Sequence, residues 1–342
     1  YCFFYARSLQ LLREGGMLAF ISSNKWFRSN YGEKLREHIA ETCQVSSITD
    51  FGDLPVFENT SAYPMIFIAK KEIRINDQPI RYTEVQSLNP PYPNVLNLIK
   101  QVGEPLPPKA LDGKNWMLTD AETVKQIKKM EEVGTPLGEY VEGKIYRGVL
   151  TGFNQAFIID GAKREELIAK DAKSSEIIKP LAVGKDIKKW YISFKDRWLI
   201  FTRRGIDIEQ YPAIKAHLNQ YRKQLEPKPK NWGNEKWEGR KAGSYKWYEI
   251  QDNTAYYQEF KKPKIVFPDI AKKPRFALDN KGFYAEATAF IIPEDDLYLL
   301  AILNSSMSLD FFLEISAEVR GGYLRFKRQY LERFPIPPAT EE

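Results

Sequence analysis

Cysteine and histidine are scarce in this sequence, and their scarcity argues against several kinds of active site. The chain contains two cysteines, Cys2 and Cys43, and two histidines, His38 and His217. Two cysteines cannot build a disulfide framework, so we expect two buried thiols in a reducing cytoplasm. Four such residues at scattered positions argue against a zinc site, and we expect no metal. A Ser-His-Asp hydrolase would depend on one of only two histidines, which argues against that class as well.

Long apolar runs are also missing. No run approaches the roughly 18 apolar residues that a membrane-spanning helix needs. The first residues show neither a basic region nor a small-residue cleavage site of a signal peptide, and we expect a cytoplasmic protein. The 342 residues are 43% hydrophobic and 28% charged, which is typical of a globular chain and not of a disordered one. A chain of this length predicts about two domains.

Positive charge and tryptophan are concentrated in one region. Residues 219–248 contain eight Lys/Arg and three acidic residues, which accounts for most of the net charge of +6. Five of the seven tryptophans lie between residues 190 and 247. A basic patch with interleaved aromatics suits a polyanion; the alternative is a solvated loop whose tryptophans cover a small core. As phosphate contacts of this patch we predict Lys228, Lys230, Arg240 and Lys241.

Helices and strands alternate in the first 86 residues. The apolar pattern predicts helices over 2–13 and 31–42, and strands over 17–21, 45–51 and 65–69. The nearly all-apolar strand 17–21 is typical of a sheet covered on both faces. We therefore predict the distal part of a doubly wound α/β domain. The sequence opens in a helix without a preceding Gly-rich strand-to-helix turn, so either a cofactor half is missing or this domain never had one.

The rest of the chain has a different pattern. Residues 87–136 read as a linker, rich in proline at first and then carrying a charged helix that begins after the N-cap Asp120. Residues 137–340 predict an α+β domain with a mostly antiparallel core. Its predicted strands lie at 191–194, 198–202, 264–267 and 283–292, and its helices at 211–225 and 296–312.

The string Asn89-Pro90-Pro91-Tyr92 has the form of the catalytic loop of amino-group DNA methyltransferases. In that loop the Asn side chain and a Pro carbonyl hold the exocyclic amine, and the Tyr stacks on the base. This chemistry needs the loop at the carboxyl end of a buried central strand. Residues 81–88 are too polar and too alternating for such a strand, so we interpret the string as a coincidence within a proline-rich linker.

Two glycine-turn motifs are candidates for reading DNA bases. In the first motif, 147–154, the side chains able to reach phosphates or base edges are those of Arg147, Thr151 and Asn154. The second consists of Arg320, Gly321, Gly322 and Tyr323. Glycines permit a sharp turn or a close approach of the backbone to a groove wall. The alternatives are a hairpin with a polar tip, a turn that ends a helix, or a purely phosphate-binding role.

A series of strings in a fixed order carries a family resemblance. They occupy residues 8–24, 50–57, 65–70, 147–157, 178–187, 264–269, 303–305, 320–322 and 334–337. Together they resemble the adenine-specific DNA methyltransferases of restriction–modification systems, the type IIG and related enzymes that end in a TaqI-like specificity domain. The resemblance implies a target-recognition domain for double-stranded DNA over 137–340. It also implies a parent enzyme that transfers a methyl group from S-adenosylmethionine to N6 of a flipped adenine.

The same resemblance places the cofactor motif and the true catalytic loop upstream of Tyr1. It implies that this fragment alone binds no S-adenosylmethionine and is inactive. Its expected partners are double-stranded DNA and either its own N-terminal methyltransferase half or a separate catalytic subunit. Phe67 is the counterpart of a base-stacking aromatic in the family, although it also fits a core position of a buried strand. An upstream nuclease stays an open question.

Three other functions fit the sequence. One is a stand-alone DNA specificity subunit, and another is a phage-defence methyltransferase without a nuclease. The third is a carbohydrate-binding module that uses the Trp/Tyr cluster. Salt distinguishes the last from the others, because DNA binding weakens steeply with ionic strength and sugar binding does not.

Overall fold

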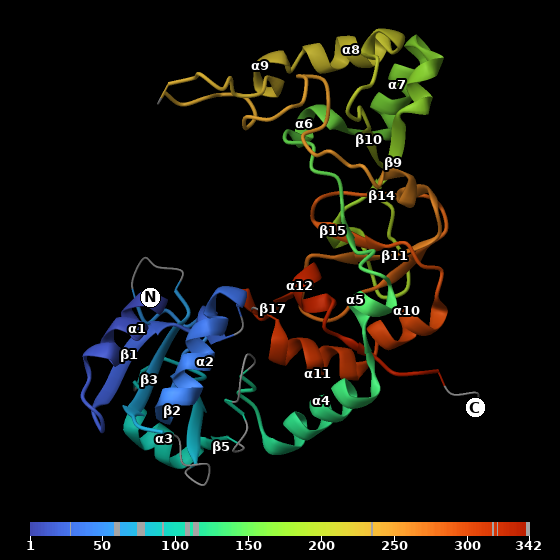
Figure 1. Ribbon diagram of the computed structural model, residues 1–342. Coiled ribbons are helices and arrows are strands. Elements are labelled where there is room, and N and C mark those ends of the chain that lie inside the picture. The colour runs from blue at the N-terminus through green and yellow to red at the C-terminus, as the bar shows by residue number, and fades with distance from the viewer. Residues whose placement is uncertain are drawn as a thin grey trace. The chain divides into compact units, whose positions relative to one another are not determined.

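The chain forms two compact units in the computed structural model (Figure 1). The first consists of Tyr1–Thr135 and Leu309–Arg325, and the second of Pro136–Ser308 and Phe326–Glu342. The structure describes residues 1–27, 29–57, 62–73, 79–90, 92–106, 110–111, 116–233, 235–316, 318–319 and 321–339.

The first unit is built on a five-stranded sheet in the order β1-β3-β2-β4-β5. Its strands are β1 (Met17–Ser23), β2 (Cys43–Asp50), β3 (Pro64–Lys71), β4 (Ile80–Glu84) and β5 (Glu104–Leu106). Strand β3 is antiparallel to both β1 and β2, and β4 is parallel to β2. Strands β1, β2 and β4 therefore point the same way, and their carboxyl ends lie at one edge of the sheet.

Four helices of this unit are α1 (Cys2–Leu11), α2 (Glu33–Thr42), α3 (Val95–Val102) and α4 (Ala121–Val133). Three of them, α1, α2 and α4, agree with the predicted pattern, and α3 lies in the segment that was predicted as a proline-rich linker. The Asp120 carboxylate caps α4 by accepting hydrogen bonds from the backbone N–H groups of Glu122 and Thr123. Residues 81–88 were judged too polar for a buried strand, but the first four of them belong to β4. This is possible because β4 is only partly buried: Ile80 and Thr83 are buried, whereas Arg81 and Glu84 are exposed.

An aromatic cluster fills the core of the first unit. The rings of Tyr5, Trp26, Phe67 and Trp116 pack edge to face or stacked, with centroids 5.2–6.2 Å apart. Trp116 lies in the segment that was predicted as a linker. Because Trp116 and Leu106 are buried in this core, residues up to Thr135 belong to the first unit, and the division expected at residue 86 does not appear in the structure.

The second unit is α+β, as predicted. Two four-stranded sheets run in the orders β14-β9-β10-β8 and β13-β11-β15-β7. Their strands are β7 (Tyr146–Arg147), β8 (Ile158–Asp160), β9 (Ile178–Ala182), β10 (Arg197–Ile200), β11 (Lys264–Pro268), β13 (Ala277–Asp279), β14 (Tyr284–Ala285) and β15 (Ala289–Ile292). All these pairs are antiparallel except β14 with β9. The strand predicted at 191–194 is wrong, because only Ile192 forms an isolated bridge, with Ile187.

Short helices surround these sheets. They are α5 (Leu137–Tyr140), α6 (Asn154–Phe157), α7 (Gly161–Lys170), α8 (Pro212–Asn219), α9 (Arg222–Leu225), α10 (Leu297–Leu303) and α12 (Arg328–Leu331). Helix α11 (Ser306–Ile315) and the hairpin β16 (Glu318–Val319) and β17 (Tyr323–Arg325) lie mainly in the first unit. Over the described ranges no single helix is long and apolar enough to cross a membrane; only α10 and α11 taken together pass that test, with a bend of 58° between them.

Candidate functional site

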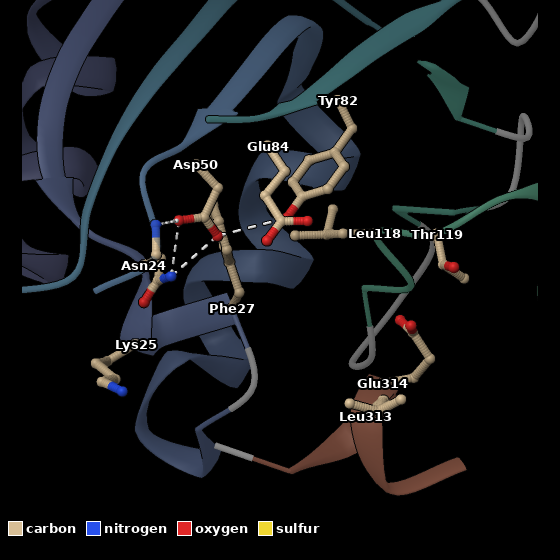
Figure 2. A pocket seen from close by; sticks show the side chains of 11 residues that line it. Asn24, Lys25, Phe27, Asp50, Tyr82, Glu84, Leu118, Thr119, Leu313 and Glu314 are labelled. Carbon is tan, nitrogen blue, oxygen red and sulfur yellow. Dashed lines mark hydrogen bonds between the residues drawn. The ribbon is translucent and has the colours of Figure 1, made fainter. Parts of the chain in front are cut away.

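A pocket of about 300 Å³ opens at the carboxyl edge of the sheet in the first unit (Figure 2). Asn24 directly follows β1, Asp50 ends β2 and Glu84 ends β4. Ligands of open α/β sheets bind outside the carboxyl ends of parallel strands. The topology therefore gathers these three polar side chains where such a sheet holds its ligand.

Asp50 organises this pocket. Its carboxylate is buried and accepts two hydrogen bonds from Asn24 Nδ2, at 3.0 and 2.9 Å. It also accepts one from the Gly52 backbone N–H at 2.8 Å and a long one from the Tyr82 hydroxyl at 3.5 Å, as Figure 2 shows. These bonds fix the Asn24 amide and the turn after β2. With the rings of Phe27 and Tyr82 in the wall, the pocket suits a flat ligand with N–H donors.

The Asn89 string lies on the wall of a neighbouring cavity. This cavity measures about 710 Å³ and shares Tyr82 and Glu84 with the first pocket. The Asn89 backbone N–H donates to Ser87 Oγ at 3.0 Å, and Tyr92 is 77% exposed. Pro91 lies outside the described residues. The string follows β4, whose Arg81 and Glu84 are exposed, and not a strand that is buried along its whole length. We keep the interpretation that it is not the catalytic loop.

Replacing Asn89 by Ala in the full-length parent is expected to leave methylation within about twofold of the wild type, because a catalytic Asn contributes far more, roughly 10²-fold or above. Incorporation of labelled methyl groups into DNA measures this. The variant Tyr92→Ala is the matched second change, since a genuine catalytic loop needs both side chains. Complete loss of activity in either variant, with unchanged thermal melting, would restore the string as catalytic.

The structure corrects the expected role of Phe67. Its ring is 0% exposed and lies in the aromatic core between Trp26 and Trp116. A residue that stacks on a flipped base must present an open ring face, so Phe67 is a core residue. An aromatic side chain that meets this requirement is Phe57, which follows β2 and is 44% exposed.

In the first glycine-turn motif, contacts within this chain require the two glycines. A Cβ at Gly148 would lie 2.1 Å from the Glu286 carbonyl oxygen, so no side chain fits there. Gly152 has a φ of +81°, and a Cβ there would lie 2.7 Å from Arg240 Cδ. The sequence correctly indicated a close backbone approach, but the approached groups belong to this chain.

The polar side chains of this motif are partly engaged. Thr151 is buried, and its hydroxyl donates to Asn154 Oδ1 at 2.6 Å. The Asn154 amide in turn donates to Glu286 Oε1 at 3.4 Å. Thr151 is therefore a poor DNA ligand, which corrects the expectation for that residue. Arg147 is exposed and uses Nε to donate to the Ala287 carbonyl at 3.1 Å. The positive charge of Arg147 also acts on Asp252, where it opposes the rise that burial causes in the pKa of that carboxyl.

The second motif forms the turn between β16 and β17. Gly321 and Gly322 have φ values of +86° and +72°, a backbone conformation that favours glycine. The Gly321 N–H donates to Asp53 Oδ2 at 2.9 Å, and Tyr323 is 39% exposed. Arg320 lies outside the described residues. A hairpin turn, not a helix end, accounts for the two glycines.

Arg240 is a structural residue and not a phosphate ligand. Its side chain is 4% exposed. All five of its N–H groups are used by backbone carbonyls, those of Thr151, Leu225, Lys246, Trp247 and Glu249. Burial lowers the pKa of Arg240 to about 10, so it stays charged at neutral pH. The prediction of a phosphate contact is corrected because no donor remains for one.

The fixed Arg240 closes the base of a projecting loop, residues 227–240. Pro227 and Arg240 form a β-bridge, and the Lys228 N–H donates to the Arg240 carbonyl at 2.9 Å. Inside the loop the rings of Trp232 and Trp237 meet edge to face at 4.6 Å, and Trp237 Nε1 donates to the Glu226 carbonyl. In Figure 1 this segment extends beyond the end of α9. The tryptophans thus stiffen the loop.

The loop and its flank carry exposed cations. Arg222 pairs with Glu226 and Lys223 with Glu238, both at 2.5 Å. By contrast, no ion pair joins a described carboxylate to any of four lysines of this region: Lys228, Lys230, Lys236 and Lys241. Lys228 is half-buried and the other three are exposed. A stiff loop with unpaired lysines is suited to contact a phosphate backbone. Within the described ranges, no cluster of His, Cys, Asp or Glu could hold a metal ion.

Two protein-family models match this chain. Residues 179–336 match the TaqI-like C-terminal specificity domain, and residues 1–57 match the Eco57I restriction-modification methylase. The predicted resemblance is confirmed: the chain is similar to a restriction–modification methylase over its first residues and to a TaqI-like specificity domain over most of its second half. The projecting loop, residues 227–240, lies inside the match to the TaqI-like specificity domain.

Curated relatives support the same assignment. The type II methyltransferase M.PaeR7I of Pseudomonas aeruginosa is 28% identical over 98% of this chain and 58% of its own length. The type II methyltransferase M.XhoI of Xanthomonas vasicola is 26% identical over 98% and 61%. The chain thus spans about three-fifths of the length of these relatives. Among solved structures, the type IIL restriction-modification enzyme MmeI in complex with DNA shares the fold, with a TM-score of 0.58 and 12% identity over 97% of this chain and 41% of its own.

Proposed function

We propose that this chain recognises double-stranded DNA within a restriction–modification methyltransferase. The observation that carries the proposal is the stiff loop 227–240, which presents unpaired lysines inside the segment matched to a specificity domain. Phosphate contacts fix register and orientation on a duplex, and neighbouring side chains then read bases. Arg147, which is exposed, is the side chain of the first glycine-turn motif that is best suited to this second role.

The reaction proposed for the parent is methyl transfer from S-adenosylmethionine to N6 of a flipped adenine. It rests on the family resemblance and on relatives that are type II methyltransferases. The described residues of the first unit do not fit the cofactor. Strand β1 runs into a 3-10 helix, Asn24–Phe27, whose Trp26 and Phe27 are buried, and no Gly-rich turn leads from a described strand into a helix. We therefore propose that the cofactor site belongs to the remaining part of the parent.

An exposed apolar surface, which we call the α1/β1 face, is the basis for proposing which partner this chain binds for that reaction. It comprises Phe3, Phe4 and Leu11 of α1, which are 90%, 73% and 71% exposed, and it borders the edge strand β1. Met17 and Ile21 of β1 are about half exposed and point to the side of the sheet opposite to the one that α1 covers. Strand β1 is also an edge strand of its sheet, so the backbone N–H and C=O groups on its outer side can pair with a further strand. Such a surface on a soluble protein marks an interface. The occupant that we propose is the methyltransferase half that the longer relatives contain.

This surface also bears on the alternatives. A stand-alone specificity subunit needs the α1/β1 face only if a separate catalytic chain docks on it, and a carbohydrate-binding module does not need it. The phage-defence enzyme without a nuclease differs from our proposal only outside this chain. The α1/β1 face therefore favours a DNA methyltransferase, in one chain or two, over a sugar-binding protein.

The triple variant Lys228→Ala, Lys230→Ala and Lys241→Ala is expected to weaken binding to every duplex alike. It should lower the slope of log affinity against log salt by about one unit for each phosphate that the protein no longer neutralises, three at most. Fluorescence anisotropy with random-sequence duplexes between low and moderate salt measures the slope. Lys215→Ala is the matched control, because Lys215 lies in the same unit and pairs with Glu209 at 2.6 Å. Binding equal to the wild type would mean that the loop is only a solvated surface.

A further inference from the structure

A basic pocket lies in the second unit, and none of its lining residues belongs to the projecting loop 227–240. It measures about 240 Å³, and three of its lining residues are cations: Lys179 of β9, Arg203 after β10 and Lys261 at the end of the 3-10 helix Tyr257–Lys261. The acid in its lining is Glu176, whose carboxylate accepts a hydrogen bond from the Tyr211 hydroxyl at 3.0 Å. The pocket therefore has a surplus of positive charge.

The three cations are held close together without being neutralised. No described carboxylate forms an ion pair with Lys179, Arg203 or Lys261 within 4 Å. Lys179 is half-buried, and its pKa is lowered by burial first and then by the neighbouring charge of Lys261, with Glu176 opposing the shift. Like charges placed together in a partly desolvated site cost free energy that a bound anion would recover.

Aromatic rings support these cations. The Arg203 guanidinium lies 5.2 Å and Lys261 Nζ 5.9 Å from the centroid of the Tyr257 ring. The Tyr257 ring in turn packs against buried Phe201, which packs against buried Tyr284. Cation–π contacts and a rigid floor restrict how far the charged groups can swing. A planar guanidinium beside ammonium groups is the donor set that binds phosphate.

We propose that this pocket binds a phosphate group of the DNA backbone, as a second anchor separate from the loop 227–240. The proposal rests on the proposed function of duplex binding. All three cations lie inside the segment matched to the specificity domain. A pocketed phosphate fixes the position of the backbone more tightly than lysines on an exposed loop do, since Arg203 and Lys179 are already oriented. The pocket thus sets register, and the loop supplies general attraction.

The first test is the salt dependence of duplex binding by the full chain. Random-sequence duplex is titrated against the wild type, Lys179→Gln, Arg203→Gln and Lys261→Gln, with the exposed Lys195→Gln of the same unit as the control. Each pocket variant should lower the slope by about one unit and weaken binding roughly five- to tenfold at 0.1 M salt, whereas the control should not. Lys261 is exposed, so its variant reports on binding even if Lys179→Gln lowers the melting temperature.

The outcomes separate two failures. Absence of duplex binding by the wild type overturns the proposed function itself. Wild-type binding with unchanged slopes in all three pocket variants overturns only the pocket.

The second test detects occupancy at Lys179 directly. An amine-acylating reagent labels lysines, and mass spectrometry of the peptides compares Lys179 with Lys195. Duplex DNA should protect Lys179 several-fold and leave Lys195 unchanged. Inorganic phosphate and adenosine monophosphate are the comparison ligands. Stronger protection by the mononucleotide than by duplex at equal phosphate concentration would overturn the backbone as the source and assign the pocket to a free nucleotide.

Discussion

Arg240→Ala is expected to destabilise the second unit by about 3–5 kcal/mol. The substitution removes a buried charge whose five N–H groups donate to five backbone carbonyls. The carbonyls of Leu225, Trp247 and Glu249 lose this donor in the interior, whereas those of Thr151 and Lys246 still accept from the backbone N–H groups of Gln251 and Glu249. A domain of this size is stable by only about 5–15 kcal/mol, so the melting temperature should fall by roughly 10 °C or more. Thermal and urea unfolding of the chain measure the destabilisation.

Two further variants sharpen this experiment. Arg240→Lys keeps the charge but offers three donors from one point, and it should recover little of the stability. Lys241→Ala changes the exposed neighbour and should leave the melting temperature unchanged while it weakens duplex binding. A melting temperature for Arg240→Ala within 2 °C of the wild type, roughly the shift of 1 kcal/mol or less, would show that the five bonds do not hold the unit together.

The Arg240 result illustrates what sequence can and cannot tell about the interface. Counting charges located the basic segment 219–248. It could not tell which arginine folds inward, because the carbonyls that bind Arg240 come from separate stretches of the chain, from Thr151 to Glu249. Hydrogen bonds between residues so far apart in the chain leave no periodic pattern in the sequence. The same holds for Gly148, whose need for close approach was readable but whose neighbour, Glu286, was not.

The fold was more predictable than the pocket of the first unit. The helices α2 and α4 and the strands β1 to β3 follow from apolar periodicity and capping. Strand β4 was missed because its exposed positions carry charged residues, Arg81 and Glu84. No role was predicted for Asn24 and Asp50, since their contact depends on the parallel alignment of β1 and β2 through the intervening β3.

Expressed alone, the chain is expected neither to methylate DNA nor to bind S-adenosylmethionine at micromolar concentration. Co-expression with the remaining methyltransferase half of the parent should restore activity. The reason is the α1/β1 face, where α1 and the edge strand β1 present the apolar groups and open backbone groups on which we propose that the other half docks. Incorporation of labelled methyl groups and calorimetric titration with the cofactor measure the two properties.

Charged substitutions on this face give the matched test. Phe4→Glu and Leu11→Glu alter side chains that are already exposed in the isolated chain, so its melting temperature should not fall. In the two-part enzyme the same charges would be buried at the interface without a partner, which costs several kcal/mol and should reduce methylation by about 100-fold or more. Val133→Glu, at a position 57% exposed on α4, is the control and should have no effect. If the isolated chain binds the cofactor tightly, the cofactor site lies within this chain. If the Phe4 and Leu11 variants assemble and methylate as well as the control, the other half docks elsewhere.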